Sequence, residues 1–417
     1  MIRGLTGRSL RSIAGLFLIS RILILFAGYV GTNLFAAYTE PPVYIQQGPG
    51  VVPERAMKLP FDLSDTRWPN EKDFAKFDSF AYFDIAVHGY DRYRIEEPHP
   101  PANWVFFPLY PLVLRAAAAL TGLFGLTSLT IVGSLLSNVF FFAALLYVFG
   151  ICRQQNLDES QTRAVLVLML LYPTSLFYSL PYTESLFLLL SAASLYYSSD
   201  KRYALAFIAA GLSTVTRVPG VMNLFFVAGM VLLNERFPLT KRHLRLASYG
   251  LLSLLPIGLY LLFMKIRTGD WLAPFHEQSS WYRQTALPFT NYAHYFQKPY
   301  FMAPGGWDNG LLAFVMSTAV ILVYLGFLIL RGKELIREPR QLLLWVYGAL
   351  LIVIPFSSQP FYLASVVRYM MVCIPFYLYT VRLTTSRDNA RFAYKMLFAV
   401  IHIITVIGFF NDYYFMA

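Results

Sequence analysis

The sequence predicts an all-α polytopic membrane protein. Hydrophobic residues make up 57% of its 417 residues and charged residues only 14%. A soluble domain carries about 45–50% apolar residues and about 25% charged residues. Eleven stretches are also apolar enough to cross a bilayer, although some are shorter than the about 20 residues that a span usually needs. A soluble globule is excluded because it would lack the charges to cover its surface. A disordered chain is excluded because disorder needs low hydrophobicity.

The predicted spans follow one another along the chain, which predicts a single membrane domain over residues 1–417. They lie at about residues 11–37, 128–150, 164–180, 183–198, 203–217, 219–234, 246–266, 311–330, 341–356, 363–381 and 393–411. The first follows three arginines and continues to about Ala37 without a small-residue cleavage site. We therefore expect a retained span rather than a signal peptide.

The segment 105–121 is a twelfth apolar stretch, but it holds Pro108, Pro111 and Arg115. If it crossed the bilayer, the later basic loops would fall on the outer side. We therefore expect a bent interfacial helix on the outer surface. The inner segments then hold 19 Lys and Arg against 7 Asp and Glu, and the rest of the chain holds 15 against 16. Because positive residues gather in cytoplasmic loops, the N-terminus is predicted inside and the C-terminus outside.

Two large loops then face outward, at about residues 38–104 and 267–310. Both are rich in Tyr, Trp, Phe and Pro, so we expect folded caps rather than flexible linkers. The formal charge of +11 is accounted for by the inner loops, so no nucleic-acid partner is predicted. The sequence shows neither a solenoid repeat nor two hydropathy-matched halves typical of many carriers.

The first outer loop contains a candidate catalytic residue, Asp78. Residues 77–90 follow a short helical pattern that ends at a glycine. Phe77, Phe80 and Tyr82 would press the carboxylate toward the membrane, and partial desolvation favours proton acceptance by a general base. The alternative is that Asp78 only caps the loop helix, and the spacing alone favours that alternative.

Three arginines, Arg115, Arg217 and Arg368, lie near the outer ends of predicted spans, and Arg21 lies deeper in the first one. Ionisable groups at such depth are costly and usually face a cavity or a partner. Guanidinium groups bind phosphate oxygens through two donors, so a lipid-linked phosphate is one candidate ligand. Pairing with Glu184, or extension toward the head groups, is the alternative for each arginine. Four arginines on one face favour the anionic ligand.

Metal and cysteine chemistry are not indicated. The six histidines show no metal-ligand spacing, and the acidic residues of the first outer loop form no fixed ligand motif. Cys152 and Cys373 lie far apart and match neither a disulfide framework nor a metal site. No cofactor and no divalent metal are therefore expected to be required.

The outward-facing segments, taken in order, resemble the PIG-V-like family of GT-C membrane glycosyltransferases, typified by the second mannosyltransferase of glycosylphosphatidylinositol assembly. The resemblance rests on short elements, namely Asp78-Ser79 with Tyr82, Ile85-Ala86 and Gly89-Tyr90, then Phe106-Phe107-Pro108-Leu109-Tyr110-Pro111 with Arg115, Tyr182-Thr183-Glu184-Ser185-Leu186-Phe187, Thr216-Arg217-Val218-Pro219-Gly220, and Gly269-Asp270 with Gln278, Trp281 and Arg283. The resemblance depends on all these elements together, since each one alone is a weak signal. Phe77, Ala81 and Val218-Pro219 depart from the family pattern.

The resemblance implies a GT-C-type helical bundle and an inverting transfer of a sugar, mannose by analogy, from a polyprenyl- or dolichyl-phosphate carrier on the non-cytoplasmic face. It assigns the catalytic base to Asp78. The candidate substrate-binding residues are Arg217, Arg368, Arg115, Arg283, Glu184, Tyr182, His88, Tyr90, Gln278 and Trp281. One base and several arginines suffice because a lipid phosphate is a good leaving group that needs charge stabilisation rather than a proton.

Two other functions stay open on the sequence alone. One is a lipid or sugar transporter or scramblase, although no paired repeats with broken helices are visible. The other is a non-catalytic GT-C-like assembly subunit, which the departures at Phe77 and Ala81 keep open. The acceptor, the hexose, the oligomeric state and the need for a partner subunit are also left open. A plasma membrane is expected for a prokaryotic chain and the endoplasmic reticulum for a eukaryotic one.

Overall fold

The fold is a helical bundle, seen in a computed structural model that describes residues 2, 4–35, 62–122, 124–235, 241–281, 283–303, 308–357 and 362–413. Its helices are α1 (Gly7–Leu34), α2 (Glu71–Phe74), α3 (Asp78–His88), α4 (Leu109–Thr121), α5 (Leu126–Gln154), α6 (Glu159–Leu170), α7 (Glu184–Ser199), α8 (Tyr203–Thr214), α9 (Val221–Asn234), α10 (Lys241–Leu252), α11 (Leu255–Thr268), α12 (Ala273–His276), α13 (Thr290–Gln297), α14 (Gly310–Arg337), α15 (Pro339–Val353), α16 (Val366–Met370), α17 (Ile374–Thr384) and α18 (Asp388–Phe410). Across the described ranges, β pairing is limited to one isolated bridge. The all-α prediction is confirmed.

Within the described residues, six helical segments are long and apolar enough to cross a membrane. They are Gly7–Leu34, Leu126–Gln154, Arg242–Thr268, Gly310–Arg337, Pro339–Ser357 and Asp388–Phe410. The five other predicted spans correspond to shorter helices, α6, α7, α8, α9 and the broken pair α16 and α17. At 1.5 Å per residue, the 16 residues of α7 rise about 24 Å, less than the about 30 Å of a hydrocarbon core. The count of eleven spans therefore stays a prediction.

The short helix α7 lies in the core of the bundle. It packs against α5, α8 and α9, and most of its residues are buried. Its middle is a run of small residues, Ser191 to Ser194, all buried. Small side chains allow neighbouring helices to approach closely inside a membrane bundle. The sequence of α7 therefore suits a helix surrounded by protein rather than by lipid.

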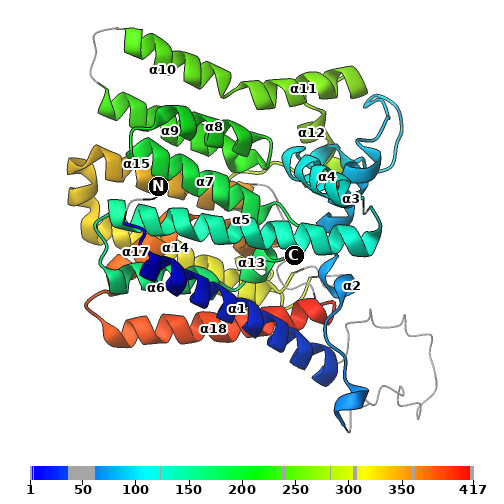
Figure 1. Cartoon of the computed structure of the whole chain (residues 1–417), viewed down its shortest axis with the longest axis horizontal. Helices are drawn as coiled ribbons and strands as arrows, with labels where there is room; N and C mark the ends of the chain where they lie inside the picture. The colour runs from blue at the N-terminus through cyan, green and yellow to red at the C-terminus, as the bar shows by residue number, and fades with distance from the viewer. Residues whose placement is uncertain are drawn as a thin grey trace.

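The short helices α2, α3, α4 and α12 gather at one end of the long helices (Figure 1). Of these, α4 corresponds to the predicted interfacial helix 105–121. Tyr110, Leu114 and Ala118 form its buried stripe, while Leu112 and Arg115 are exposed. Spacing of four residues is the pattern of an amphipathic helix. Its position at a membrane interface stays a prediction.

Residues 38–61 of the first predicted outer loop lie outside the described residues. The stretch 66–68 of this loop lies against α1. Trp68 stacks on Tyr29 at 4.4 Å between ring centroids, and the Asn33 side-chain amide donates to the Arg67 carbonyl at 2.8 Å. Arg67 in turn pairs with Asp73 at 2.6 Å. These contacts attach the chain that leads into α2 and α3 to the first long helix.

The second predicted outer loop ends in a buried carboxyl group, Asp308, just before α14. The Tyr300 hydroxyl donates to Asp308 and accepts a hydrogen bond from the Leu363 backbone N–H at 2.9 Å. Burial raises the pKa of Asp308 to about 7. An acid whose pKa is raised by folding stabilises the protein fully below its unfolded pKa of about 4, and that stability is lost as the pH rises toward the folded pKa.

The variant Asp308→Asn should therefore remove part of the pH dependence of stability. Between pH 5 and pH 7 we expect the wild type to lose up to about 1.4 kcal/mol per pH unit more than the variant, because the amide cannot titrate. Thermal unfolding of both proteins across this interval checks the expectation. Parallel pH profiles would show that Asp308 titrates at its ordinary pKa.

Candidate active site

Asp78 is the first residue of α3, and the backbone before it is unusual. Phe77 occupies the N-cap position with φ 48° and makes no side-chain cap hydrogen bond. The interpretation of Asp78 as the N-cap is therefore wrong. A non-glycine residue at positive φ costs about 1–3 kcal/mol and persists only where its surroundings impose it. The turn at Phe77 directs the Asp78 side chain toward the bundle, where it meets Arg368.

Four charged side chains from four distant segments meet there. Arg368 Nη2 lies 2.8 Å from Asp78 Oδ2, and Arg368 Nε lies 2.6 Å from Glu184 Oε1. The same Glu184 oxygen lies 2.5 Å from Arg217 Nη1. We refer to Asp78, Glu184, Arg217 and Arg368 as the Asp78 cluster. Glu184 joins the two arginines, and Arg368 joins Glu184 to Asp78.

The Asp78 cluster is accessible mainly through two of its four side chains. The side chains of Glu184 and Arg368 are 0% and 3% exposed, whereas those of Arg217 and Asp78 are 15% and 25% exposed. Buried charges are tolerated only when they are paired with good geometry. This explains why the two most buried members of the cluster, Glu184 and Arg368, contact each other. Any molecule that enters the cluster must therefore reach Asp78 and Arg217 first.

Aromatic rings surround the guanidinium groups. The Arg368 guanidinium lies 4.6 Å from the ring centroids of both Phe177 and Tyr182. Arg217 and Arg283 both lie over the Tyr369 ring, at 4.8 and 5.7 Å. Such cation–π contacts stabilise cations in places from which water is excluded. The shared Tyr369 ring brings Arg283, from the second predicted outer loop, beside the Asp78 cluster.

The position of Asp78 depends on Lys76, which lies two residues earlier. Lys76 Nζ donates to the Phe409 carbonyl at 2.7 Å and lies 2.6 Å from Asp412 Oδ1, at the end of α18. The Tyr182 hydroxyl donates to the Lys76 carbonyl at 2.6 Å. The chain entering α3 is therefore held by α18 on one side and by the segment before α7 on the other.

Arg217 is held in place by a tight turn between α8 and α9. A Cβ atom at Gly220 would collide with the Ser213 carbonyl, so only glycine fits there. The turn continues as a short 3₁₀ helix, Val218–Gly220, with Pro219 in its first turn. The departure from the family pattern at residues 218 and 219 thus leaves a compact turn that directs Arg217 toward Glu184.

The other candidate binding residues bond to groups outside the Asp78 cluster. Arg115 donates to the Ala86 carbonyl at 3.1 Å, near the end of α3. The Tyr90 hydroxyl donates to the Phe106 carbonyl at 2.6 Å. His88, Gln278 and Trp281 bond to Asp84, to the Pro274 carbonyl and to the Ala102 carbonyl, respectively. Arg21, inside the first helix, donates to Ser179.

Sequence reasoning missed Lys76, Phe177 and Tyr369. A lysine close to a candidate base was a usable signal for the first. No signal distinguished the two aromatic residues among the 29 tyrosines and 36 phenylalanines of the chain. In the parts of the chain that the structure describes, no group of three or more His, Cys, Asp or Glu residues is arranged to hold a metal ion.

Glu184→Ala should destabilise the protein strongly, because it leaves Arg217 and Arg368 facing each other without the shared carboxylate. Loss of one partner of a buried ion pair costs about 3–5 kcal/mol. The matched control is Glu334→Ala, since Glu334 is exposed and pairs with Arg331 at 2.6 Å, and such surface pairs contribute about 1 kcal/mol or less. Thermal unfolding in detergent measures both. Equal losses of thermal stability in the two variants would contradict a central role for Glu184.

Comparison with known proteins identifies a family and several solved structures of low sequence identity. The model of the family described as mannosyltransferase (PIG-V) matches residues 60–268, which hold Asp78, Glu184 and Arg217. No curated protein matches the chain.

The solved structures that resemble the chain include two enzymes at low identity. The oligosaccharyltransferase of Archaeoglobus fulgidus, in complex with zinc and sulfate, has 12% identity and a TM-score of 0.48 over 96% of this chain and 53% of its own. ArnT from Cupriavidus metallidurans, bound to undecaprenyl phosphate, has 11% identity and a TM-score of 0.49 over 96% of this chain and 76% of its own. The chain spans about half the length of the archaeal oligosaccharyltransferase.

Proposed function

Because the chain belongs to the mannosyltransferase (PIG-V) family, we propose that it is an inverting GT-C glycosyltransferase. It moves mannose from a polyprenyl- or dolichyl-phosphate carrier to an acceptor hydroxyl on the non-cytoplasmic face of the membrane. The observation that carries this proposal is the Asp78 cluster, in which one accessible carboxylate lies beside several guanidinium groups. One base and a set of cations are what a phosphate leaving group requires.

Asp78 acts as the general base. The acceptor hydroxyl transfers its proton to Asp78 while its oxygen attacks C1 of the sugar from the face opposite the phosphate. The C1–O bond to the phosphate breaks, and the carrier leaves as a lipid phosphate with the bonding electrons. Attack from the opposite face inverts the configuration at C1. The 2.8 Å contact with Arg368 supports this role, because it orients the carboxylate.

Arg217 and Arg283 bind the phosphate of the donor. Both cations lie over Tyr369, and Arg217 is the more accessible arginine of the Asp78 cluster. Arg368 uses Nε and Nη2 for Glu184 and Asp78, which leaves Nη1 for a phosphate oxygen. Charge on the phosphate grows as the C1–O bond breaks, so these donors stabilise the transition state more than the bound donor.

The outward orientation of the Asp78 cluster is supported by the charge distribution. Glu184 begins α7, and α7 ends at Ser199 beside the predicted inner segment 198–203. That segment and the other predicted inner loops hold 19 Lys and Arg against 7 Asp and Glu. Positive residues gather on the cytoplasmic side, so the opposite end of α7, with Glu184, faces outward.

A direct test is an assay of purified protein with radiolabelled mannose on a polyprenyl phosphate and a total membrane-lipid extract as the source of acceptors. We expect label to move to a new product while free polyprenyl phosphate is released, both in the presence and in the absence of EDTA. The same label supplied as a nucleotide-linked mannose should not transfer. Transfer from the nucleotide sugar alone would contradict the proposed donor class.

A further inference from the structure

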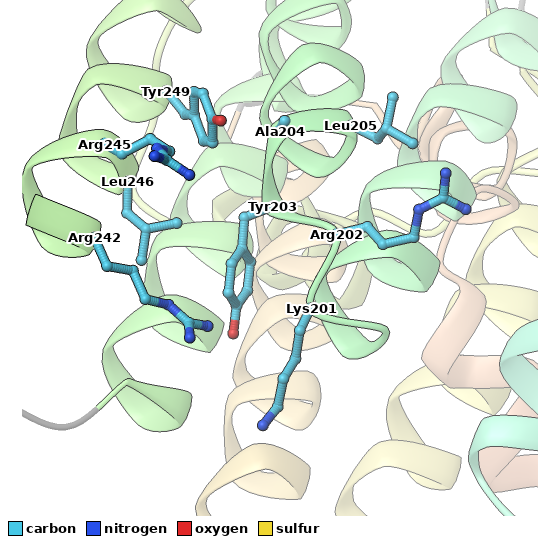
Figure 2. A pocket seen from close by; sticks show the side chains of 9 residues that line it. All are labelled: Lys201, Arg202, Tyr203, Ala204, Leu205, Arg242, Arg245, Leu246 and Tyr249. Carbon is cyan, nitrogen blue, oxygen red and sulfur yellow. The ribbon is translucent and has the colours of Figure 1, made fainter.

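A second cationic site lies at the far end of α7 from Glu184. It is a cavity of about 680 Å³, within the range of about 300–1,000 Å³ that ligand pockets usually have. We name it the basic groove. Its lining residues are Lys201, Arg202, Tyr203, Ala204, Leu205, Arg242, Arg245, Leu246 and Tyr249. They come from the turn before α8, from the first residues of α8 and from α10 (Figure 2).

The basic groove carries excess positive charge. Four of its lining residues are cations, and Arg242 pairs with Glu235 at 2.7 Å. Arg202 lies over the Tyr197 ring at 5.0 Å. Lys201 and Arg245 have no ion pair with an acid in the part of the chain that the structure describes. Arg242 and Arg245 extend from α10 toward Tyr203 (Figure 2), so the cavity is positive on the side of α10.

The helix that forms one wall of the basic groove also has an apolar surface. Leu246 is buried and packs with Tyr203 and Phe207. Leu252 of the same helix lies two turns beyond Arg245 on the same side and is 63% exposed. In a membrane protein such a leucine contacts acyl chains. A molecule with an anionic head and an apolar tail therefore fits this place better than a small soluble anion does.

The basic groove lies toward the membrane surface opposite the Asp78 cluster. The 16 residues of α7 separate Glu184 from the turn with Lys201 by about 24 Å. That distance is shorter than the about 30 Å of the hydrocarbon core, but Lys201 belongs to the predicted inner segment 198–203. The groove is therefore expected near the head groups of the leaflet predicted to be cytoplasmic, where anionic lipids attract basic residues.

We propose that the basic groove binds the phosphate-bearing head group of an anionic phospholipid of the cytoplasmic leaflet. Lys201, Arg242 and Arg245 contact the phosphate, while the acyl chains lie along α10 beside Leu252. The site is separate from the proposed donor site and holds a structural or regulatory lipid.

The test measures binding of fluorescent phosphatidylglycerol to the full-length protein in a phosphatidylcholine–detergent mixture. Lys201→Gln/Arg245→Gln should weaken binding about 30-fold, since each basic residue near an anionic lipid contributes about 1 kcal/mol and tenfold corresponds to about 1.4 kcal/mol. The matched control is Lys333→Gln/Arg337→Gln, which removes the same charge from exposed residues of α14. The control should change binding by less than about threefold.

Two results would overturn the proposal. Equal weakening in both double variants would mean that only the general positive charge of this face attracts the lipid. Displacement of the fluorescent lipid by millimolar inorganic phosphate, but not by unlabelled phosphatidylglycerol, would assign the groove to a soluble anion. Thermal unfolding of each variant in pure phosphatidylcholine and detergent should match the wild type, which shows that lost binding does not reflect lost folding.

Discussion

Asp78→Asn should abolish sugar transfer while leaving the Asp78 cluster assembled. An amide cannot accept the proton of the acceptor hydroxyl, and general-base catalysis contributes about 100–10,000-fold. The amide oxygen can still accept a hydrogen bond from Arg368, which donates to Asp78 at 2.8 Å in the wild type. We therefore expect a fall in kcat of about 1,000-fold or more, with little change in the affinity for the lipid donor. Steady-state transfer kinetics measure this.

The control for Asp78→Asn is Asp84→Asn, which removes a carboxylate from the same helix. Asp84 bonds to His88 and to the Asn103 side chain, away from Arg368. Its loss should leave kcat within about tenfold of the wild type, because it takes no proton in the proposed reaction. Near-normal turnover in Asp78→Asn, or an equal loss in Asp84→Asn, would remove Asp78 from the chemistry.

Arg217→Ala should impair use of the donor far more than use of the acceptor. Arg217 is 15% exposed beside a fully buried Glu184, and its removal leaves Glu184 paired with Arg368 at 2.6 Å. Losing one donor that stabilises developing charge costs about 100–1,000-fold in rate. We expect kcat/KM for the lipid donor to fall by that factor, while KM for the acceptor stays within about threefold.

The control for Arg217→Ala is Arg92→Ala, an exposed arginine of the first predicted outer loop. It removes the same charge without touching the Asp78 cluster, so kcat/KM should change by less than about threefold. If donor kinetics in Arg217→Ala equal those of the control, Arg217 serves only to neutralise Glu184.

Much of this fold could be predicted because composition and hydropathy are local properties. The long helices α1, α5, α14 and α18 overlap predicted spans because long apolar runs form most of each helix. The shorter helices were less predictable. A window of apolar residues has the same hydropathy whether it is one helix or a helix broken at Cys373, as between α16 and α17. The break depends on packing against neighbours, which the local sequence does not contain.

The members of the Asp78 cluster could be predicted, but their connections could not. The cost of burying charge singled out Arg217 and Arg368, and the family resemblance pointed to Asp78. Sequence alone left two partners for the arginines, Glu184 or a phosphate. The structure pairs both arginines with Glu184, and it places Arg115 at the end of α3 instead. Contacts between residues up to 290 positions apart depend on tertiary folding.

The most direct test of the central claim is a structure of the protein with a bound polyprenyl-phosphate sugar. We expect phosphate oxygens at about 3 Å from the guanidinium nitrogens of Arg217 or Arg283, with C1 of the sugar on the side that faces Asp78. A lipid phosphate bound only at the opposite end of α7, or one whose sugar points away from Asp78, would contradict the claim.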